Sequence, residues 1–456
     1  MKKIFLGIIA TFTVLLSFNT ISYAQDSPIY DASFNETGAF FANGTPITVT
    51  AGETDSTVTV TWNSGKNTQT LNSNGYIFGG GKNGTNYETS SITMESGKIA
   101  FIYGGGMSTD ENSIAQVKTS NVVINGGSIT ESLYGGGLIF STVNTTNVTV
   151  NNGTVKSVIA GGAGYAKING EVYSGGTAED SVNSKTRVNV ANLTINGGTV
   201  TVSAWGGGQG YSYTGTANVI INSGNLKNAY LTAGGSNGHT DSAYLTINGG
   251  DIGIYQSVNR GTVNNSVTTV SGGTVDKFYV GGEKDDPSVT GTVKNVSVNL
   301  ISGKISTLDA GVSNKIALDT SKENVSLVVV PKIIENSTIP KENIKEIEYT
   351  VSLEDTVRIR KGESVKIYST VSTLPKGFEN IIDKNLEVWD SADESIATVS
   401  KSGEITGVLE GETSVTVSLL DSSDTISVEV YDIPYVLVAI CVILLIVLFI
   451  LIMVSA

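Results

Sequence analysis

The sequence is poor in the residues that build disulfides and metal centres. It contains one cysteine, Cys441, and one histidine, His239, in 456 residues. A single thiol forms no disulfide within the chain, so an exported protein of this sequence would depend on burial alone for its stability. A lone histidine excludes a His-rich metal site and a second histidine general base. Because His239 lies in the polar stretch GGSNGHTDSA, we expect its side chain to be exposed.

Basic residues are also scarce. Lys and Arg number 28 against 42 Asp and Glu, and the formal net charge is −14. Proteins that bind nucleic acid carry a basic patch or stripe that neutralises phosphates. The composition therefore predicts no nucleic-acid partner, and the excess of acids favours solubility.

Both ends of the chain have the composition of targeting segments. Residues 1–24 combine Lys2 and Lys3 with an apolar run and a small-residue cleavage site, which predicts a secretory signal peptide. The segment from Tyr435 to Val454 carries no charge and is long enough for a helix across about 30 Å of hydrocarbon. Together these segments predict a single-pass protein of the cell membrane with an extracellular ectodomain.

A repeat with a period near 26 residues fills much of the chain between these ends. The stretch NVVINGGSITESLYGGG at 121–137 recurs as NVTVNNGTVKSVIAGG and NLTINGGTVTVSAWGGG. Each copy aligns on one glycine, which we call the anchor glycine. The anchor glycines are Gly65, Gly97, Gly127, Gly153, Gly198, Gly224, Gly250, Gly273 and Gly303.

Apolar residues alternate with polar residues around each anchor glycine. They stand five and three residues before it, as do Leu193 and Ile195, and two residues after it, as does Val200. A period of two predicts a strand with one buried face, and stacking successive repeats about 4.8 Å apart joins those faces into one core. The repeat predicts a parallel β-helix of about nine coils, right-handed by the general rule for parallel crossovers.

Asparagine and glycine have their own places in the repeat. Identical amides in stacked coils bond one another in a ladder, and the anchor glycine supplies a turn with positive φ. A second glycine cluster follows an aromatic residue and predicts another corner, where backbones approach closely. The residues two before the anchor are Asn63, Asn125, Asn151, Asn196, Asn222 and Asn248, with Ser271 as a near substitute and Glu95 and Ile301 as exceptions.

From about residue 346 the glycine clusters vanish and charged residues increase. Trp389 and its neighbour Val388 suit the core of a β-sandwich, and KSG and EGE mark tight turns between short strands. The ordered segments KGE, VWDS, IATV, SGEITG and EGET resemble the bacterial Ig-like domain, group 2, over residues 346–432. The resemblance implies a spacer in a surface-displayed, adhesin-like protein.

These observations predict an all-β chain: a right-handed parallel β-helix, an Ig-like β-sandwich and one C-terminal transmembrane helix. The predicted units are a signal peptide (1–24), an N-terminal cap (25–55), the β-helix (56–318), a linker or C-terminal cap (319–345), the Ig-like domain (346–432) and the transmembrane helix (435–454).

Catalytic side chains do not recur on one face of the repeat. Many parallel β-helices are polysaccharide lyases or hydrolases, which need carboxylates or a basic residue from adjacent coils. We predict no enzyme and no catalytic, cofactor-binding or metal-binding residue; calcium held by Asp285, Asp286 and backbone carbonyls stays an alternative. The acids of the repeat region fall in variable loops: Asp110, Glu111, Glu179, Asp180, Asp241, Asp285 and Asp286.

The predicted function is adhesion or surface structure in a prokaryote with a single-membrane envelope. The predicted partners are the membrane, through the C-terminal helix, and an extracellular glycan or protein whose contact residues the sequence does not identify. A polysaccharide-binding or polysaccharide-degrading β-helix is the alternative. Columns of outward threonines suit ice or crystalline polysaccharide, and exposed Tyr or Trp near the glycine corners would stack on sugars.

Overall fold

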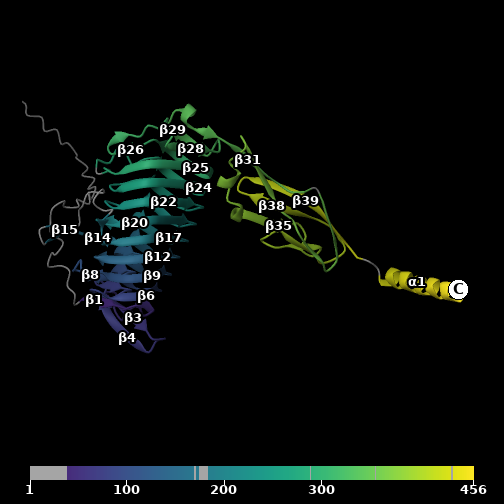
Figure 1. The fold of residues 1–456 in the computed structure, drawn as a ribbon, viewed down its shortest axis with the longest axis horizontal. Coiled ribbons are helices and arrows are strands. Elements are labelled where there is room, and N and C mark those ends of the chain that lie inside the picture. Colours follow the sequence, from purple (N-terminus) through teal and green to yellow (C-terminus); the bar gives the residue numbers. More distant parts are fainter. Residues whose placement is uncertain are drawn as a thin grey trace, which may run out of the picture.

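The computed structural model describes residues 38–168, 171–173, 183–287, 289–354, 356–432 and 435–455. The predicted signal peptide, the first part of the predicted cap, and Glu179 and Asp180 lie outside these residues. The described chain is all-β apart from short 3-10 turns and one α-helix, and its largest sheet winds into a solenoid (Figure 1).

Parallel strands stacked in register form the first side of the solenoid. Leu193 of β17, for example, pairs with Val148 of β12 and with Val219 of β20. The strands of this side are β6 (Asn86–Met94), β9 (Ala115–Ile124), β12 (Ser141–Val150), β17 (Arg187–Ile195), β20 (Tyr213–Ile221), β22 (His239–Ile247), the first halves of β24 (Thr262–Tyr279) and β25 (Thr292–Asp309), and β28 (Val325–Val329).

From Gly97 on, the chain turns at each anchor glycine into a second side, and a short third side of four strands closes some of the coils. The second side comprises β5 (Tyr76–Phe78), β7 (Lys98–Tyr103), β10 (Ser128–Tyr134), β13 (Thr154–Ile159), β18 (Thr199–Trp205), β21 (Asn225–Thr232), β23 (Asp251–Gln256), the second halves of β24 and β25, and β29 (Ile334–Ser337). The third side comprises β8 (Met107–Ser108), β11 (Leu138–Ile139), β14 (Ala163–Gly164) and β19 (Gln209–Gly210).

Two small antiparallel pairs of strands are attached to the solenoid. They are β15 (Ala166–Ile168) with β16 (Glu171–Tyr173), and β26 (Val312–Ser313) with β27 (Ile316–Ala317). After β29, the 3-10 turn η3 (Lys341–Asn343) leads to β30 (Lys345–Glu346), which pairs with β28. The stacking thus continues past residue 318, where we predicted it to end.

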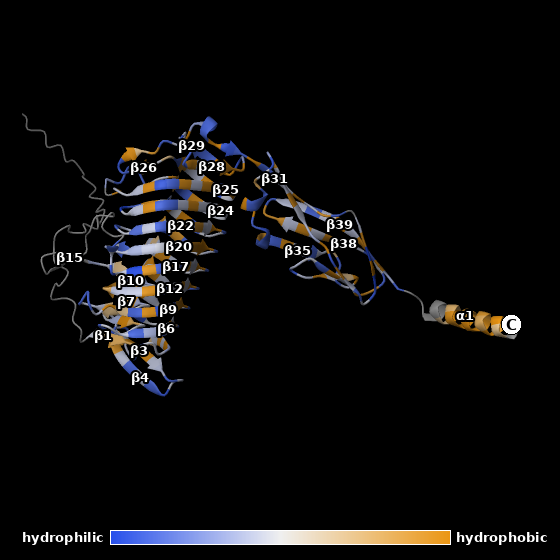
Figure 2. Ribbon diagram, in the orientation of Figure 1, coloured by the Kyte–Doolittle hydropathy of each residue, from blue (hydrophilic) through white to orange (hydrophobic). Residues whose placement is uncertain are grey.

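The apolar columns predicted from the period of two are buried. Leu193 and Ile195 are fully buried, Val200 is 1% exposed, and the interior is one continuous apolar cluster that reaches from Phe40 to Ile339. Apolar and polar residues alternate along the strands (Figure 2). The all-β, solenoid-like fold predicted from the repeat is therefore confirmed.

Glycine occupies the corner at each anchor glycine because φ is positive there, and it occupies the second corner because neighbouring backbones lie close together. All nine anchor glycines have φ between 76° and 118°, a region that side chains disfavour. At the second corner the backbones are very close, since a Cβ on Gly104 would lie 2.4 Å from the carbonyl oxygen of Gly135.

The first coil differs from the prediction. We placed it at residue 56, but β1 (Ala39–Phe41) and β2 (Ile47–Ala51) already stack in parallel on β5 and β6. β3 (Thr57–Trp62) and β4 (Asn67–Asn72) form an antiparallel hairpin that extends the sheet beyond β2. Gly65 lies in its turn. A period of two is the same in a parallel coil and in a hairpin, so it does not reveal which neighbour a strand takes.

The second unit consists of small sheets that share two apolar clusters. Trp389 is half-buried between the clusters, but Val388 is 64% exposed, because neighbouring residues of a strand point to opposite faces. The elements are β31 (Glu348–Ser352) with β34 (Thr370–Leu374); β32 (Thr356–Arg360), β39 (Ser422–Tyr431), β38 (Gly411–Leu419) and β35 (Glu387–Ser391); β33 (Ser364–Lys366), β37 (Glu404–Gly407) and β36 (Ala397–Val399); and the turns η4 (Glu379–Ile381) and η5 (Lys384–Leu386).

The second unit packs against the last coils of the solenoid (Figure 1). Ile301 and Val328 of the solenoid join Val351, Val371 and Ile382 of the second unit in one buried cluster. Ile301 is one of the two residues that break the asparagine pattern, and it is fully buried. The exception therefore marks the place where the repeat stops facing solvent and faces the second unit.

The helix α1 (Tyr435–Ser455) follows the second unit, and its side chains are described between residues 439 and 453. A helix needs about 20 consecutive apolar residues to cross the hydrocarbon core of a bilayer. Among the described residues, no helix combines sufficient length with sufficient apolarity to do so. The prediction of a single-pass membrane protein, with residues 435–454 as its span, is thus corrected.

The alternation makes a sharp prediction for stability. Ile195→Asp places a carboxylate in the interior, which costs several kcal/mol or forces its protonation, whereas the outward Thr194→Asp should change the unfolding free energy little. Urea unfolding of the full chain measures both. If the two substitutions lower the unfolding free energy by the same amount, the residue at position 195 does not face a buried interior.

Candidate functional site

The outward side of the first sheet forms a long surface rich in threonine. We call it the threonine face: the three columns of outward side chains nearest the anchor glycines, on the strands from β4 through β3, β2 and β6 to β25. Strand pairing aligns one residue per strand into a column along it. That column is Thr68, Thr61, Thr48, Thr93, Val123, Thr149, Thr194, Ile220, Thr246, Thr269 and Asn299.

A ladder of asparagine amides runs beside this column. Each Nδ2 donates to the Oδ1 of the previous coil: Asn147 to Asn121 at 2.9 Å, Asn192 to Asn147 at 2.9 Å, and Asn218 to Asn192 at 2.8 Å. In the next coil Tyr244 takes the place of asparagine, and its side chain is 45% exposed. The ladder thus ends at an exposed aromatic ring.

The threonine face carries no ionisable group other than Tyr244 in the described strands β6 to β25. A third column of outward side chains lies on the other side of the asparagine ladder and completes the threonine face. Its members are Thr89, Thr119, Thr145, Val190, Thr216, Ser242, Asn265 and Asn295. Charged side chains begin only one residue further out, where Lys118 pairs with Glu88 at 2.9 Å. A neutral face on a chain of net charge −14 suits an uncharged partner.

The asparagine ladder predicted from the sequence lies at the first corner. Asn151 donates to Asn125, Asn196 to Asn151 and Asn222 to Asn196, each at 2.8 Å, and Asn248 donates to Asn222 at 2.9 Å. Glu95 accepts from Asn125 at 2.9 Å and begins the ladder. Asn63 does not join, because it lies in the β3–β4 turn.

Sequence reasoning missed the ladder on the threonine face. Its signal is the first asparagine of the motifs NVVIN, NVTVN, NLTIN and NVIIN, which recurs with the same spacing as the second. The continuation of the face through β2, β3 and β4 was also missed, since the hairpin does not follow the repeat.

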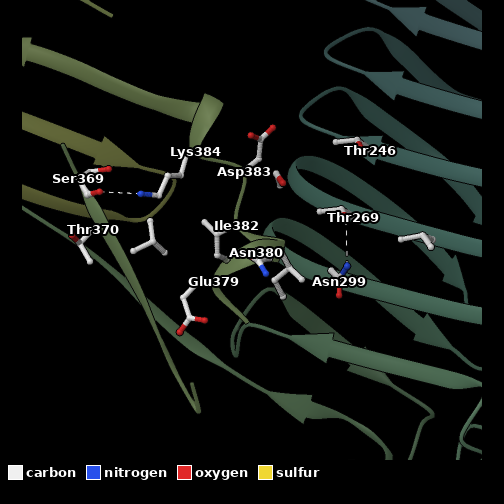
Figure 3. A pocket seen from close by; sticks show the side chains of 14 residues that line it. Thr246, Thr269, Asn299, Ser369, Thr370, Glu379, Asn380, Ile382, Asp383 and Lys384 are labelled. Atoms are coloured by element: carbon white, nitrogen blue, oxygen red, sulfur yellow. Dashed lines mark hydrogen bonds between the residues drawn. The ribbon is translucent and has the colours of Figure 1, made fainter. Parts of the chain in front are cut away.

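A cleft of about 770 Å³ lies where the threonine face meets the second unit. Thr246, Thr269 and Asn299 line one wall, and residues 379–384 line the other (Figure 3). Asn299 is 7% exposed, and its Nδ2 donates to the Oγ1 of Thr269 over 3.4 Å. Tyr244 and Ile220 lie one strand before the lining residues Val267 and Thr246.

The charged side chains of the cleft are held by their own unit. Lys384 donates to the carbonyl oxygen of Ser369 at 2.9 Å, and Asp383 accepts from the backbone N–H of Asn385 at 2.9 Å. Backbone N–H groups and the Thr373 hydroxyl hold the pKa of Glu379 below its ordinary value. The cleft therefore offers a solenoid wall of hydroxyl and amide groups opposite a wall that carries two acids and one lysine.

The aromatic residues at the second glycine corner do not form a sugar-binding surface. Phe78, Tyr103, Tyr134 and Trp205 are between 0% and 7% exposed. Their rings stack along the solenoid, with centroids 4.9 Å apart for Phe78–Tyr103 and 4.8 Å for Tyr103–Tyr134. The third side covers them.

His239 is buried, contrary to our expectation. It is 6% exposed at the start of β22, and its Nε2 lies 2.8 Å from Oδ1 of Asp241. Asn264 donates to the same oxygen at 3.0 Å, and the hydroxyl of Tyr213 donates to Oδ2. Burial opposes ionisation of Asp241, but these hydrogen bonds lower its pKa, and the bond to Asp241 raises the pKa of Tyr213. The cluster holds a carboxylate with donors on both oxygens, and it keeps the tyrosine protonated.

The loop acids are not gathered into a metal site in the described part of the chain. No group of three or more His, Cys, Asp or Glu there could hold a metal ion. Asp110 accepts from the backbone N–H of Asn112 in its own loop at 3.0 Å. Lys284 binds Asp309 at 2.5 Å, beside Asp285 and Asp286 in the sequence.

Glu283 is the most confined acid of that loop, at 6% exposed. Its backbone N–H donates to Gln256 at 3.0 Å, and Lys277 lies 4.0 Å from its carboxylate. Burial raises its pKa, Asp286 and Asp285 add to the rise, and Lys277 opposes it.

No protein-family model matches this sequence, and no curated protein is significantly similar to it. The resemblance of residues 346–432 to a bacterial Ig-like domain therefore stays a prediction.

The corner ladder predicts a measurable contribution to stability. Asn196→Ala removes two ladder bonds and should lower the unfolding free energy by about 1–2 kcal/mol. The exposed Asn228 makes a matched control, whose replacement by Ala should stay within about 0.5 kcal/mol of the parent. Urea unfolding compares them, and equal values would show that the ladder does not stabilise the fold.

The raised pKa of Glu283 predicts that the thermal stability of the protein depends on pH. Its folded pKa lies above its unfolded pKa, so its contribution to stability is greatest below the unfolded value and declines as pH rises towards the folded value. Glu283→Gln removes this decline, so it should raise Tm more at about pH 7 than at about pH 4, close to the ordinary Glu pKa. Glu111→Gln, at an exposed position, should shift Tm equally at both. A uniform shift for Glu283→Gln would contradict the prediction.

Proposed function

We propose that this protein binds, without catalysing a reaction, a regular and uncharged polysaccharide through the threonine face, as an adhesin-like protein does. The observation that carries the proposal is the continuous neutral face from β4 to the cleft, on a chain of net charge −14. An anionic polymer would be repelled by the chain and would find no cation in the three columns of the strands β6 to β25.

The chemistry of the face matches that of a sugar chain. Threonine presents a hydroxyl and a methyl group, and the laddered asparagines retain one N–H and one carbonyl lone pair each after bonding their neighbours. These groups repeat with the strand spacing of about 4.8 Å. Tyr244 adds an exposed ring, whose face suits the apolar face of a sugar.

The other parts of the chain have supporting roles in this proposal. We take the solenoid to be a right-handed β-helix and the second unit to be an Ig-like spacer of group 2. The shared cluster around Ile301 and Val351 supports a stiff connection between the two. No enzymatic activity is proposed, since His239, Asp241 and Asp309 are hydrogen-bonded to neighbouring side chains of the solenoid.

Two lysine substitutions in one coil test the proposal. Thr194→Lys puts a long cation on the threonine face, and Thr201→Lys puts the same side chain on the half-buried outward position of β18, on the second side. Thr194→Lys should weaken retention of the full chain on insoluble cellulose, chitin or β-1,3-glucan by about tenfold, which corresponds to about 1.4 kcal/mol. Thr201→Lys should bind as the parent does.

The remaining outcomes separate the alternatives. Retention that is the same for both variants, or absent for the parent on every neutral polymer, refutes the proposal. If the protein inhibits ice growth and does not bind polysaccharide, the threonine face binds ice instead. If it releases new reducing ends from a polymer, it is an enzyme that cleaves polysaccharide. Either result refutes the proposal.

A further inference from the structure

The threonine face leads into the cleft at the second unit. The column Thr194, Ile220, Thr246, Thr269 continues without a break from open sheet to the cleft wall. Residues 379–384 stand opposite, so a polymer that lies along the face meets a wall there (Figure 3). A chain end, rather than the middle of a chain, fits a face that stops against a wall.

The volume of the cleft is that of a small-molecule site, and most of the residues that line it are polar. Its volume of about 770 Å³ falls within the range of about 300–1,000 Å³ that is usual for ligand pockets, which favour domain interfaces. Asn299 is more than nine-tenths buried and lies in the wall (Figure 3). The exposed residues Tyr244 and Ile220 border the solenoid wall and supply an apolar rim.

The polar groups of the cleft favour a neutral ligand with many hydroxyls. Thr246, Thr269 and Ser271 supply hydroxyls, and Asn299 and Asn380 supply amides that both donate and accept. Lys384 already donates to Ser369, and Glu379 already accepts from Thr373 at 2.9 Å. The charged residues of the lining are the acids Glu379 and Asp383 and the base Lys384, so negative charge exceeds positive charge in the cleft and disfavours an anionic ligand.

We infer that this interdomain cleft binds the terminal sugars of a neutral polysaccharide, with Tyr244 stacking on the chain at the entrance and Asn299 hydrogen-bonding inside. The inference rests on the proposed function and deepens it. The threonine face holds the length of the polymer, and the cleft recognises its end. Soluble oligosaccharides, which consist largely of ends, should then bind in the cleft even though they are too short to use the whole face.

Calorimetric titration of the full chain with cellohexaose, chitohexaose and laminarihexaose tests the inference, with hexagalacturonate as the charged probe. One neutral hexamer should bind, and hexagalacturonate should not. Tyr244→Ala and Asn299→Ala should each weaken binding at least tenfold, and Tyr244→Phe should restore it, since the ring remains. Ile316→Ala trims a side chain that is 70% exposed in the β26–β27 hairpin, which lies on the side of the solenoid away from the second unit (Figure 1), and it should have no effect.

A variant on the open part of the face separates this inference from the proposed function. Thr149→Lys should weaken retention on the insoluble polymer and leave the hexamer affinity unchanged. Retention of the polymer without binding of any hexamer overturns the inference and leaves the proposed function standing. If the protein binds neither the insoluble polymer nor any hexamer, both the inference and the proposed function are refuted. Binding of a hexamer that Tyr244→Ala and Asn299→Ala leave intact, with melting curves showing both variants folded, places the site outside the cleft.

Discussion

Stacking of coils in one register is the constraint on which the rest of the structure depends. Each first-side strand pairs in parallel with the strands of the coils before and after it, residue for residue, as Leu193 does with Val148 and Val219. Every position in the repeat therefore becomes a column along the solenoid. Apolar positions make the core, asparagines make two ladders, and outward threonines make a face. A shift of one residue in any coil would turn its apolar residues outward and break all of these columns together.

The columns also explain why the repeat changes at its ends. Glu95 replaces asparagine where the ladder needs only an acceptor, and it receives the amide of Asn125. At the other end Ser271 lines the cleft and Ile301 enters the cluster shared with the second unit. A ladder amide at 301 would be buried among apolar side chains, which is costly without a partner. Departures from the repeat thus coincide with contacts that only the end coils make.

Charge is distributed so that the threonine face stays neutral. Acids and bases lie in loops and outer columns, where they pair locally, as Lys284 does with Asp309. Asp241 receives donors on both oxygens, and its pKa is lowered despite burial. Glu283 is the contrary case, since burial raises its pKa. Neither acid lies on the threonine columns, and the binding chemistry proposed for the face comes from hydroxyl, amide and aromatic groups alone.

The sequence by itself determined the features that follow from a short period: the buried alternation at Leu193 and Ile195, the positive φ of the anchor glycines, and the ladder through Asn151 and Asn196. These depend on residues next to one another in the chain or repeated at one offset. Only the tertiary structure decided that β3 folds back as a hairpin, that His239 is buried against Asp241 and Asn264, and that Thr246 and Asn299 share a cleft with residues 379–384. Such pairings join segments whose separation follows no period. A local pattern shows which face of a strand is apolar, but the neighbour that covers or extends it is chosen by the packing of the whole chain.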